Sequence, residues 1–154
     1  MNALSFTNQS TAYTLSPELS QPASIETVRR PSSDELPRED ALLQKLGARG
    51  WGRIIYFRNY YEPDWGGSGR ALSPKALDAL SRFVADAQFP VAASFPSVFL
   101  TDKGGLELVW ESATGKSVQV EFTGSGAEFY EQATEDEGAV AFADLTWLAR
   151  KLAS

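Results

Sequence analysis

The sequence predicts an α+β domain in which two to three helices cover one face of a four-stranded antiparallel meander. Two observations support this fold class. Apolar residues recur with the helical period up to about residue 90, and with the strand period of two from Pro96 onwards. Turn residues then follow one another at the short spacing of β-hairpins. One apolar face of such a sheet needs a cover, and the helices supply it.

Residues 1–38 are expected to form a flexible or extended N-terminal arm. They are rich in Ser, Thr, Pro, Asn and Gln, and their apolar residues follow no period. Residues 39–154 then make up the single domain. The first twenty residues lack the basic and apolar regions of a secretory signal, and no apolar run approaches the ~20 residues that span a bilayer. We therefore expect a cytoplasmic protein without a membrane segment.

The first helical pattern begins near Glu39 and meets three glycines, Gly47, Gly50 and Gly52. Each glycine lowers helix stability by roughly 1 kcal/mol. The following segment, 53–61, resembles a strand in its β-branched and aromatic content and a helix in its spacing. We favour a helix with a break or kink at the glycines.

Two further helices are predicted. Ser73 and Pro74 are typical of a helix start, so the second helix should run over 74–88, before Phe89-Pro90 ends it. The last helix is predicted over about 139–153. Its buried stripe would consist of Phe142, Leu145, Leu148 and Leu152.

Four strands are predicted between these helices, over 97–101, 106–111, 117–122 and 127–130. Gly-containing turns separate them, and alternate residues should point to opposite faces of the sheet. One face would carry Leu106, Leu108, Trp110, Val118, Val120 and Phe122. The other would carry Glu107, Val109, Glu111, Gln119 and Glu121.

The segment from about residue 50 to 131 resembles a group of small uncharacterised bacterial proteins. The matching residues are Trp65-Gly66-Gly67, Ser73-Pro74, Asp102-Lys103-Gly104-Gly105 and Leu108-Val109-Trp110-Glu111. The resemblance implies a fold of this kind and no particular activity. The sequence departs from the group at Gly66, where an Asp usually follows the Trp, so no role of that carboxylate carries over.

The chain has no His and no Cys, and its net charge is −6. The missing residue types exclude thiol nucleophiles, disulfides, Cys/His zinc sites, Ser-His-Asp triads and imidazole catalysis. We expect a protein that is not an enzyme and that has no cofactor and no metal site. Its acidity argues against a nucleic-acid ligand and suits a basic protein partner.

The leading hypothesis is a non-catalytic interaction protein: an inhibitor, an immunity-type factor or a regulatory adaptor, as a monomer or homodimer. The predicted partner-binding residues are Trp65, Arg70, Glu128, Glu131, Glu135, Asp136 and Glu137. The last five form an acidic run that could dock on a basic surface or simply be a solvated loop. Trp65 could equally be an apolar plug that fixes its glycine-rich loop.

Two alternatives remain open at this point. A nucleic-acid accessory protein would use the basic and aromatic residues Lys45, Arg49, Arg53, Tyr56, Arg58 and Tyr60. These arginines could instead pair with the acidic run, and the aromatic rings could belong to the core. A carboxylate-based, metal-assisted enzyme would use Glu107, Glu111 and Glu121, which could also be a solvated sheet face.

Overall fold

A computed structural model describes residues 35–62, 69–90 and 94–153, with the backbone alone for 35–37. All of these residues belong to one compact unit, Pro31–Ser154. Most of the predicted arm therefore lies outside the described residues. Its last residues do not, because the first helix already begins at Glu35 and not near Glu39.

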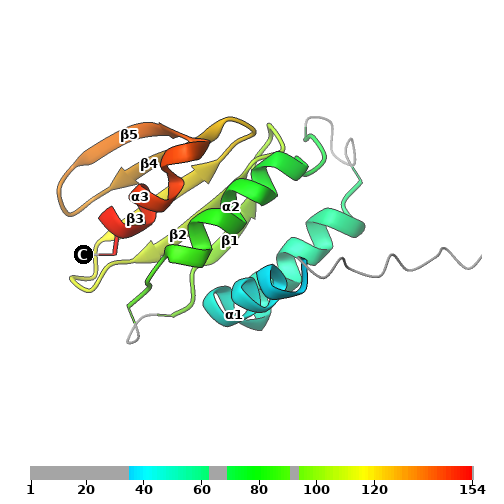
Figure 1. Cartoon of the computed structure of the whole chain (residues 1–154), viewed down its shortest axis with the longest axis horizontal. Helices are drawn as coiled ribbons and strands as arrows, with labels where there is room; N and C mark the ends of the chain where they lie inside the picture. Colours follow the sequence, from blue (N-terminus) through cyan, green and yellow to red (C-terminus); the bar gives the residue numbers. More distant parts are fainter. Residues whose placement is uncertain (1–34, 63–68, 91–93, 154) are drawn as a thin grey trace, which may run out of the picture. The chain divides into compact units, whose positions relative to one another are not determined.

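A five-stranded antiparallel sheet forms the centre of this unit (Figure 1). The strands follow the chain order without a crossover, so the predicted meander is confirmed. The strands are β1 (Ser97–Leu100), β2 (Leu106–Glu111), β3 (Ser117–Phe122), β4 (Gly126–Glu131) and β5 (Asp136–Ala141). Gly104 makes the β1–β2 turn with φ +81°, a left-handed conformation that favours glycine.

The predicted number of four strands is wrong, and so is the start of the last helix at residue 139. Residues 136–141 form β5, which pairs with β4 along its whole length. The segment Gly138 to Ala141 has small side chains that fit either conformation, and the hairpin with β4 decides for the strand. The last helix, α3 (Leu145–Lys151), follows a single 3₁₀ turn, η1 (Phe142–Asp144). Phe142 is accordingly half-buried, not part of a buried helical stripe.

The other two helices are α1 (Glu35–Asn59) and α2 (Pro74–Asp86). The prediction of a helix over most of 53–61 is confirmed, and so is the break at a glycine. Only Gly47 leaves the helical conformation, with φ 68° and ψ 172°. A Cβ on residue 47 would stand only 2.7 Å from the ring of Phe95, which is closer than van der Waals contact allows. Backbone conformation and close packing thus both require glycine there.

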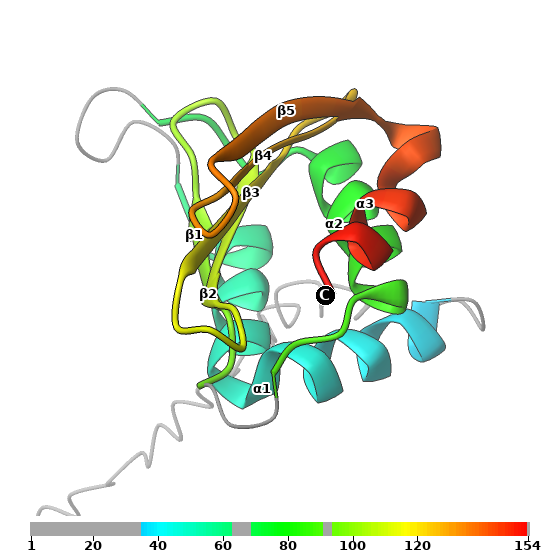
Figure 2. The same ribbon diagram turned by 90° about the vertical axis from the view of Figure 1, so that its left-hand side faces the viewer.

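α2 and α3 cover one side of the sheet, α1 packs against α2 and the β1 edge, and the core fills the space between the two layers (Figure 2). The predicted inward residues of β2 and β3 are all buried. Phe83 of α2 lies at the centre, with ring centroids 5.2 Å from Phe122 and 6.2 Å from Trp110. Such a two-layer arrangement leaves the opposite face of the sheet uncovered by the described residues.

Candidate functional site

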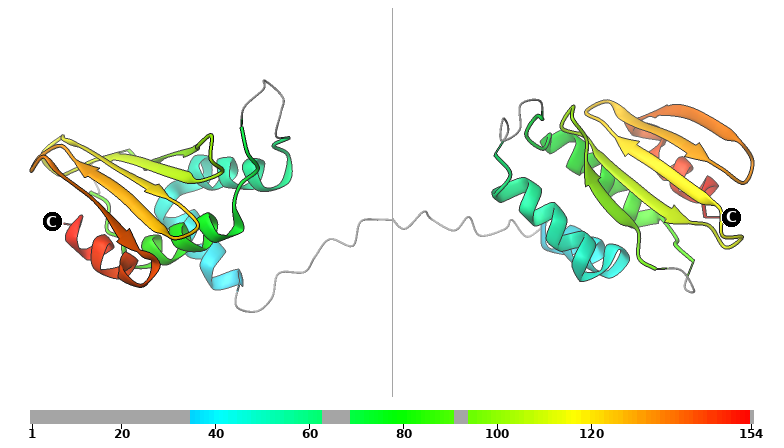
Figure 3. Two further views of the ribbon diagram at one scale, coloured as in Figure 1. Left: turned by 90° about the horizontal axis from the view of Figure 1, so that it is seen from above. Right: turned by 180° about the vertical axis from the view of Figure 1, so that it is seen from behind.

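The uncovered face of the sheet, here called the open face, is the most distinctive surface of the described chain. Figure 3 (right) shows the sheet with α2 and α3 behind it and α1 beside β1. None of the five strands contains a Lys or Arg residue. Alternation along the strands places five glutamates on the open face: Glu107, Glu111, Glu121, Glu128 and Glu137.

Three of these glutamates form a row across the middle of the sheet. Glu107 of β2 pairs with Glu121 of β3, and Glu121 pairs with Glu128 of β4. The amide of Ser112 donates to the Lys116 carbonyl at 2.8 Å, so these two residues, which follow the last pair of β2 and β3, form a hydrogen-bonded pair. Hydrogen-bonded and non-hydrogen-bonded pairs alternate along antiparallel strands. Glu107 and Glu121 therefore occupy a non-hydrogen-bonded pair, where opposing side chains lie closest.

Among the described residues, no ion pair within 4 Å involves this row. The ion pairs within 4 Å among these residues join Arg38 to Asp78, Arg58 to Glu39, Arg150 to Asp86 and Lys151 to Asp136. None of them involves the open-face glutamates. Like charges directly opposite each other on neighbouring strands destabilise a sheet. The row thus sets three like charges on neighbouring strands.

Aromatic and aliphatic side chains accompany the glutamates on the open face. Phe99 of β1 stands opposite Glu107, and Tyr130 of β4 stands opposite Gln119. Their exposed fractions are 39% and 38%, which is high for large apolar side chains. The open face therefore combines negative charge with apolar area, a mixture typical of protein interfaces.

The predicted acidic run does not form one surface. It folds into the β4–β5 hairpin, so the expectation of a single solvated loop is wrong. Glu128 and Glu137 lie on the open face, whereas Glu131 and Asp136 lie on the helical side. Asp136 there forms an ion pair with Lys151, and Thr134 donates a hydrogen bond of 2.9 Å to Glu131. Glu135 occupies the turn with φ 53°.

Sequence reasoning assigned Glu107 and Glu121 to one hypothesis and Glu128 to another. Strand register brings the three together. It also adds Phe99 and Tyr130, which sequence reasoning did not select as site residues. Strand alternation alone would have placed both on the open face, since each stands next to a buried strand residue.

A second surface lies on the outer side of α1. Arg49, Arg53, Tyr56 and Tyr60 recur at helical spacing and share one face, here called the basic stripe. The guanidinium of Arg53 lies 5.1 Å from the ring centroid of Phe99, so the stripe meets the β1 edge of the open face. The rings of Tyr56 and Tyr60 stack at 6.5 Å, with exposed fractions of 52% and 69%.

The other two basic candidates lie elsewhere. Lys45 donates to the carbonyl of Ala87 just beyond the end of α2. Arg58 donates to Glu39 at 3.4 Å, and its guanidinium lies 5.8 Å from the ring centroid of Trp51. Neither residue pairs with the acidic run within the described chain. Lys45 joins α1 to the chain after α2, and Arg58 joins two parts of α1, so the six predicted residues divide into the basic stripe and two structural contacts.

Trp65 lies outside the described residues. Arg70 is exposed, and its amide donates to the Asp102 carbonyl at 3.2 Å beside the β1–β2 turn. The same turn lies near Glu121, whose Oε1 is 3.3 Å from the position that a Cβ of Gly105 would take, but no ion pair within 4 Å joins Arg70 to the described acidic residues. The structure thus does not join Arg70 to the acidic candidates.

The carboxylate candidates Glu107 and Glu121 are cross-strand partners in the β2–β3 hairpin. Glu111 instead stands opposite Ser117. Within residues 35–62, 69–90 and 94–153, no group of three acidic side chains is placed to hold a metal ion. The row runs across an uncovered sheet, which gives the enzyme hypothesis little geometric support.

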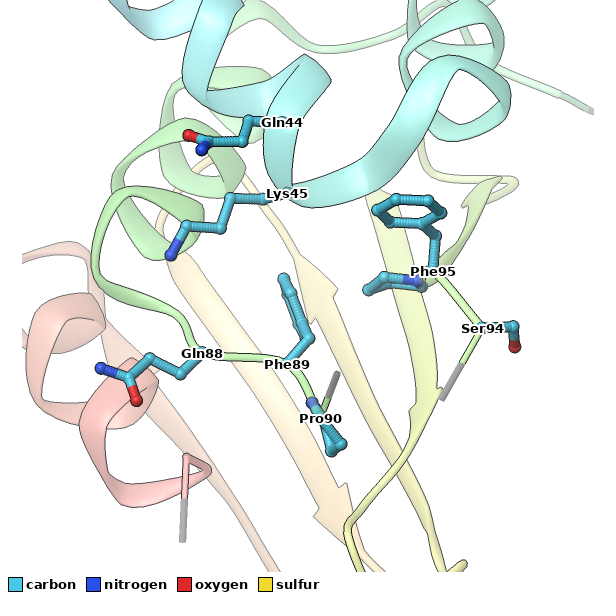
Figure 4. A pocket seen from close by; sticks show the side chains of 8 residues that line it. Gln44, Lys45, Gln88, Phe89, Pro90, Ser94 and Phe95 are labelled. Carbon is cyan, nitrogen blue, oxygen red and sulfur yellow. The ribbon is translucent and has the colours of Figure 1, made fainter. Parts of the chain in front are cut away.

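The described surface also contains a groove of about 520 Å³ between α1 and the chain that joins α2 to β1 (Figure 4). Phe89, Pro90, Phe95 and Pro96 supply apolar walls, and Lys45 points toward the end of α2, where its amine is already bonded. The wall of the groove includes Pro90 and Ser94, the described residues on either side of the segment 91–93. We assign the groove no role.

Comparison of the chain with protein-family models, with curated proteins and with solved structures gives no match. The resemblance to small bacterial proteins therefore stays a prediction. No helix in the described ranges has the length and hydrophobicity of a membrane-spanning segment.

Proposed function

We propose that this protein is a non-catalytic interaction protein that binds a basic protein partner through the open face. The acidic row Glu107–Glu121–Glu128 is the single observation that carries the proposal. Cross-strand repulsion of this kind destabilises the free protein, and a partner bearing Lys or Arg side chains would relieve it on binding. The exposed rings of Phe99 and Tyr130 would supply apolar contact at the same surface.

The charge distribution supports a long-range component of such binding. The whole chain carries a net charge of −6, and the open face concentrates acidic residues without a basic one on its strands. A field of one sign accelerates the approach of an oppositely charged partner and weakens as salt increases. Binding should therefore be strong at low salt and reversible by raising the salt concentration.

A capture experiment with two charge-matched variants tests the proposal. The immobilised chain is exposed to a lysate of its native host at low salt and eluted with salt. The first variant, E107Q/E121Q/E128Q, removes the row. The second, D40N/E62Q/D144N, removes three exposed acidic residues that lie outside the sheet strands. Both variants change the net charge by the same amount.

We expect the wild type and the second variant to recover the same basic protein in stoichiometric amount, and the first variant to lose it. An equal loss in both variants would show that net charge alone is responsible. Full recovery by the first variant would refute a role of the row.

The basic stripe favours a second candidate, a nucleic-acid accessory function. The exposed Arg49 and the half-buried Arg53, beside two stacked tyrosines, offer charge and stacking to a single strand. Mobility shift with fluorescent oligothymidylate at low salt tests it. Under this alternative, R49E/R53E abolishes the shift, and R38E/R150E, at exposed arginines outside the stripe, preserves it. No shift with the wild type would dismiss this candidate.

A further inference from the structure

The β5 strand has one paired edge and one free edge within the described chain. Its neighbours there are β4, α3 and η1. Glu137, Gly138, Ala139 and Ala141 are all exposed. At the opposite end of the sheet, α1 lies beside β1, so the two edges of the sheet differ (Figure 3).

The hydrogen bonds that flank β5 show which of its backbone groups are unpaired. The amide of Phe142 donates to the Ser125 carbonyl at 3.0 Å, which continues the β4–β5 register as a hydrogen-bonded pair. Because such pairs alternate, residues 136, 138 and 140 direct their N–H and C=O groups to β4. Glu137, Ala139 and Ala141 therefore direct theirs to the free edge.

The β3–β4 pairing supports this assignment independently. The amide of Gln132 donates to Ser117 at 3.0 Å, and that of Thr123 donates to Gly126 at 2.9 Å. These bonds turn the even-numbered residues of β4 to β3 and leave its odd-numbered residues for β5. The parity agrees with the one deduced from Phe142.

Features that commonly protect an edge strand are sparse in β5. Proteins block edges with Pro, Lys, bulges or very short strands. The sequence of β5 has no Pro and no Lys, and its six residues keep register with β4 without interruption. Its central side chains are small, so another strand can approach closely. Only Asp136 and Glu137 are charged, and both stand at the start of the strand.

We propose that β5 pairs antiparallel with β5 of a second copy of this chain, with Ala139 opposite Ala139. This register joins all three free residues of each strand and forms about six interchain hydrogen bonds, against about four after a shift of two residues. It also places Glu137 opposite Ala141. A register that set Glu137 against Glu137 would bring like charges together. The acidic residues thus select one register instead of preventing the pairing.

The pairing has a consequence for binding, which rests on the proposed function. Residues paired across strands point to the same face, so the two open faces lie on the same side of one continuous sheet. A basic partner would meet two acidic rows at once, and binding to both raises its avidity.

The first test removes an edge donor. In Ala139→Pro the lost N–H is one that points away from β4, and Pro is tolerated at such edge positions. The matched variant Ala139→Thr retains the N–H and has a high strand preference. Light scattering across a concentration series should give wild type and Ala139→Thr twice the 16.8 kDa mass at high concentration. Ala139→Pro should stay at 16.8 kDa with an unchanged circular dichroism spectrum.

The second test examines the register and does not depend on proline. Ala141→Lys places a positive charge opposite Glu137 of the other copy, twice by symmetry, and should tighten the dimer roughly 2- to 30-fold. Ala141→Glu should weaken it by a similar factor. Equal dimer affinity in both variants would refute this register.

A wild type that stays monomeric at every concentration, or a dimer that Ala139→Pro leaves intact, would refute the pairing. The proposed function is tested separately by repeating the capture experiment with Ala139→Pro. If the wild type forms no dimer but Ala139→Pro still captures the basic partner, the pairing is refuted and the proposed function stands.

Discussion

Replacing Glu121 with Gln should stabilise the protein, because Glu121 is the middle member of the acidic row. Strand register pairs it with Glu107 on one side and with Glu128 on the other, and its Oε1 lies 3.3 Å from the position that a Cβ of Gly105 would take. The Glu107 pair is non-hydrogen-bonded, with Cα atoms about 4.5 Å apart, and the Glu128 pair is hydrogen-bonded, at about 5.5 Å. A directly opposed like-charge pair destabilises a sheet by roughly 0.2–1 kcal/mol.

Removing both repulsions should raise the free energy of unfolding by about 0.5–2 kcal/mol, most of it from the closer Glu107 pair. For a chain of this length, each 1 kcal/mol corresponds to roughly 2–4 °C in Tm. Urea denaturation followed by tryptophan fluorescence measures the change, since Trp110 is 5% exposed in the core. The gain should shrink at about 1 M salt, where the Debye length falls to about 3 Å.

Glu111→Gln provides the control for this prediction. Glu111 lies on the same face of β2, but its cross-strand partner is Ser117. The control changes the net charge equally without removing a like-charge pair. If Glu121→Gln were no more stable than Glu111→Gln, cross-strand repulsion would not be present and the proposed function would lose its main support.

Three further predictions concern the free energy of unfolding measured by urea denaturation. Phe83→Ala should lower it by about 3–5 kcal/mol, because the ring fills the centre of the core; a loss below ~1 kcal/mol would contradict that packing. Gly47→Ala should lower it by about 1–2 kcal/mol, because residue 47 has a positive φ and a Cβ there would contact the Phe95 ring. Gly52→Ala should raise it by up to about 1 kcal/mol, because a Cβ there meets no atom within 4 Å and Ala favours the helix. Equal effects at both glycines would refute this distinction. Ser73→Ala should lower it by about 0.5–1 kcal/mol through loss of the α2 cap, and Ser73→Asp should not.

The α+β class, the meander, the second helix and most strand boundaries were predictable because they depend on local signals. Alternation at Leu106 and Leu108 identifies a buried strand face, and Ser73-Pro74 marks a helix start. The helix over most of 53–61 was favoured correctly by its spacing, since a half-buried helix keeps its period even with β-branched residues.

Other features depend on distant contacts. Nothing in the sequence distinguishes the three glycines of α1 as the place of the kink. The kink lies at Gly47, where the ring of Phe95 packs against the backbone. The small residues of β5 fit a helix or a strand, and only pairing with β4 selects the strand.

The order of residues alone specifies an acidic chain without imidazole or thiol groups, and a sheet that is polar on one face. Which of its charges become neighbours depends on the folded sheet. Strand register sets Glu107, Glu121 and Glu128 side by side, although they lie on three strands. The physical reason is that alternation fixes the face of a side chain locally, whereas its neighbours across the sheet depend on hydrogen bonds between distant residues.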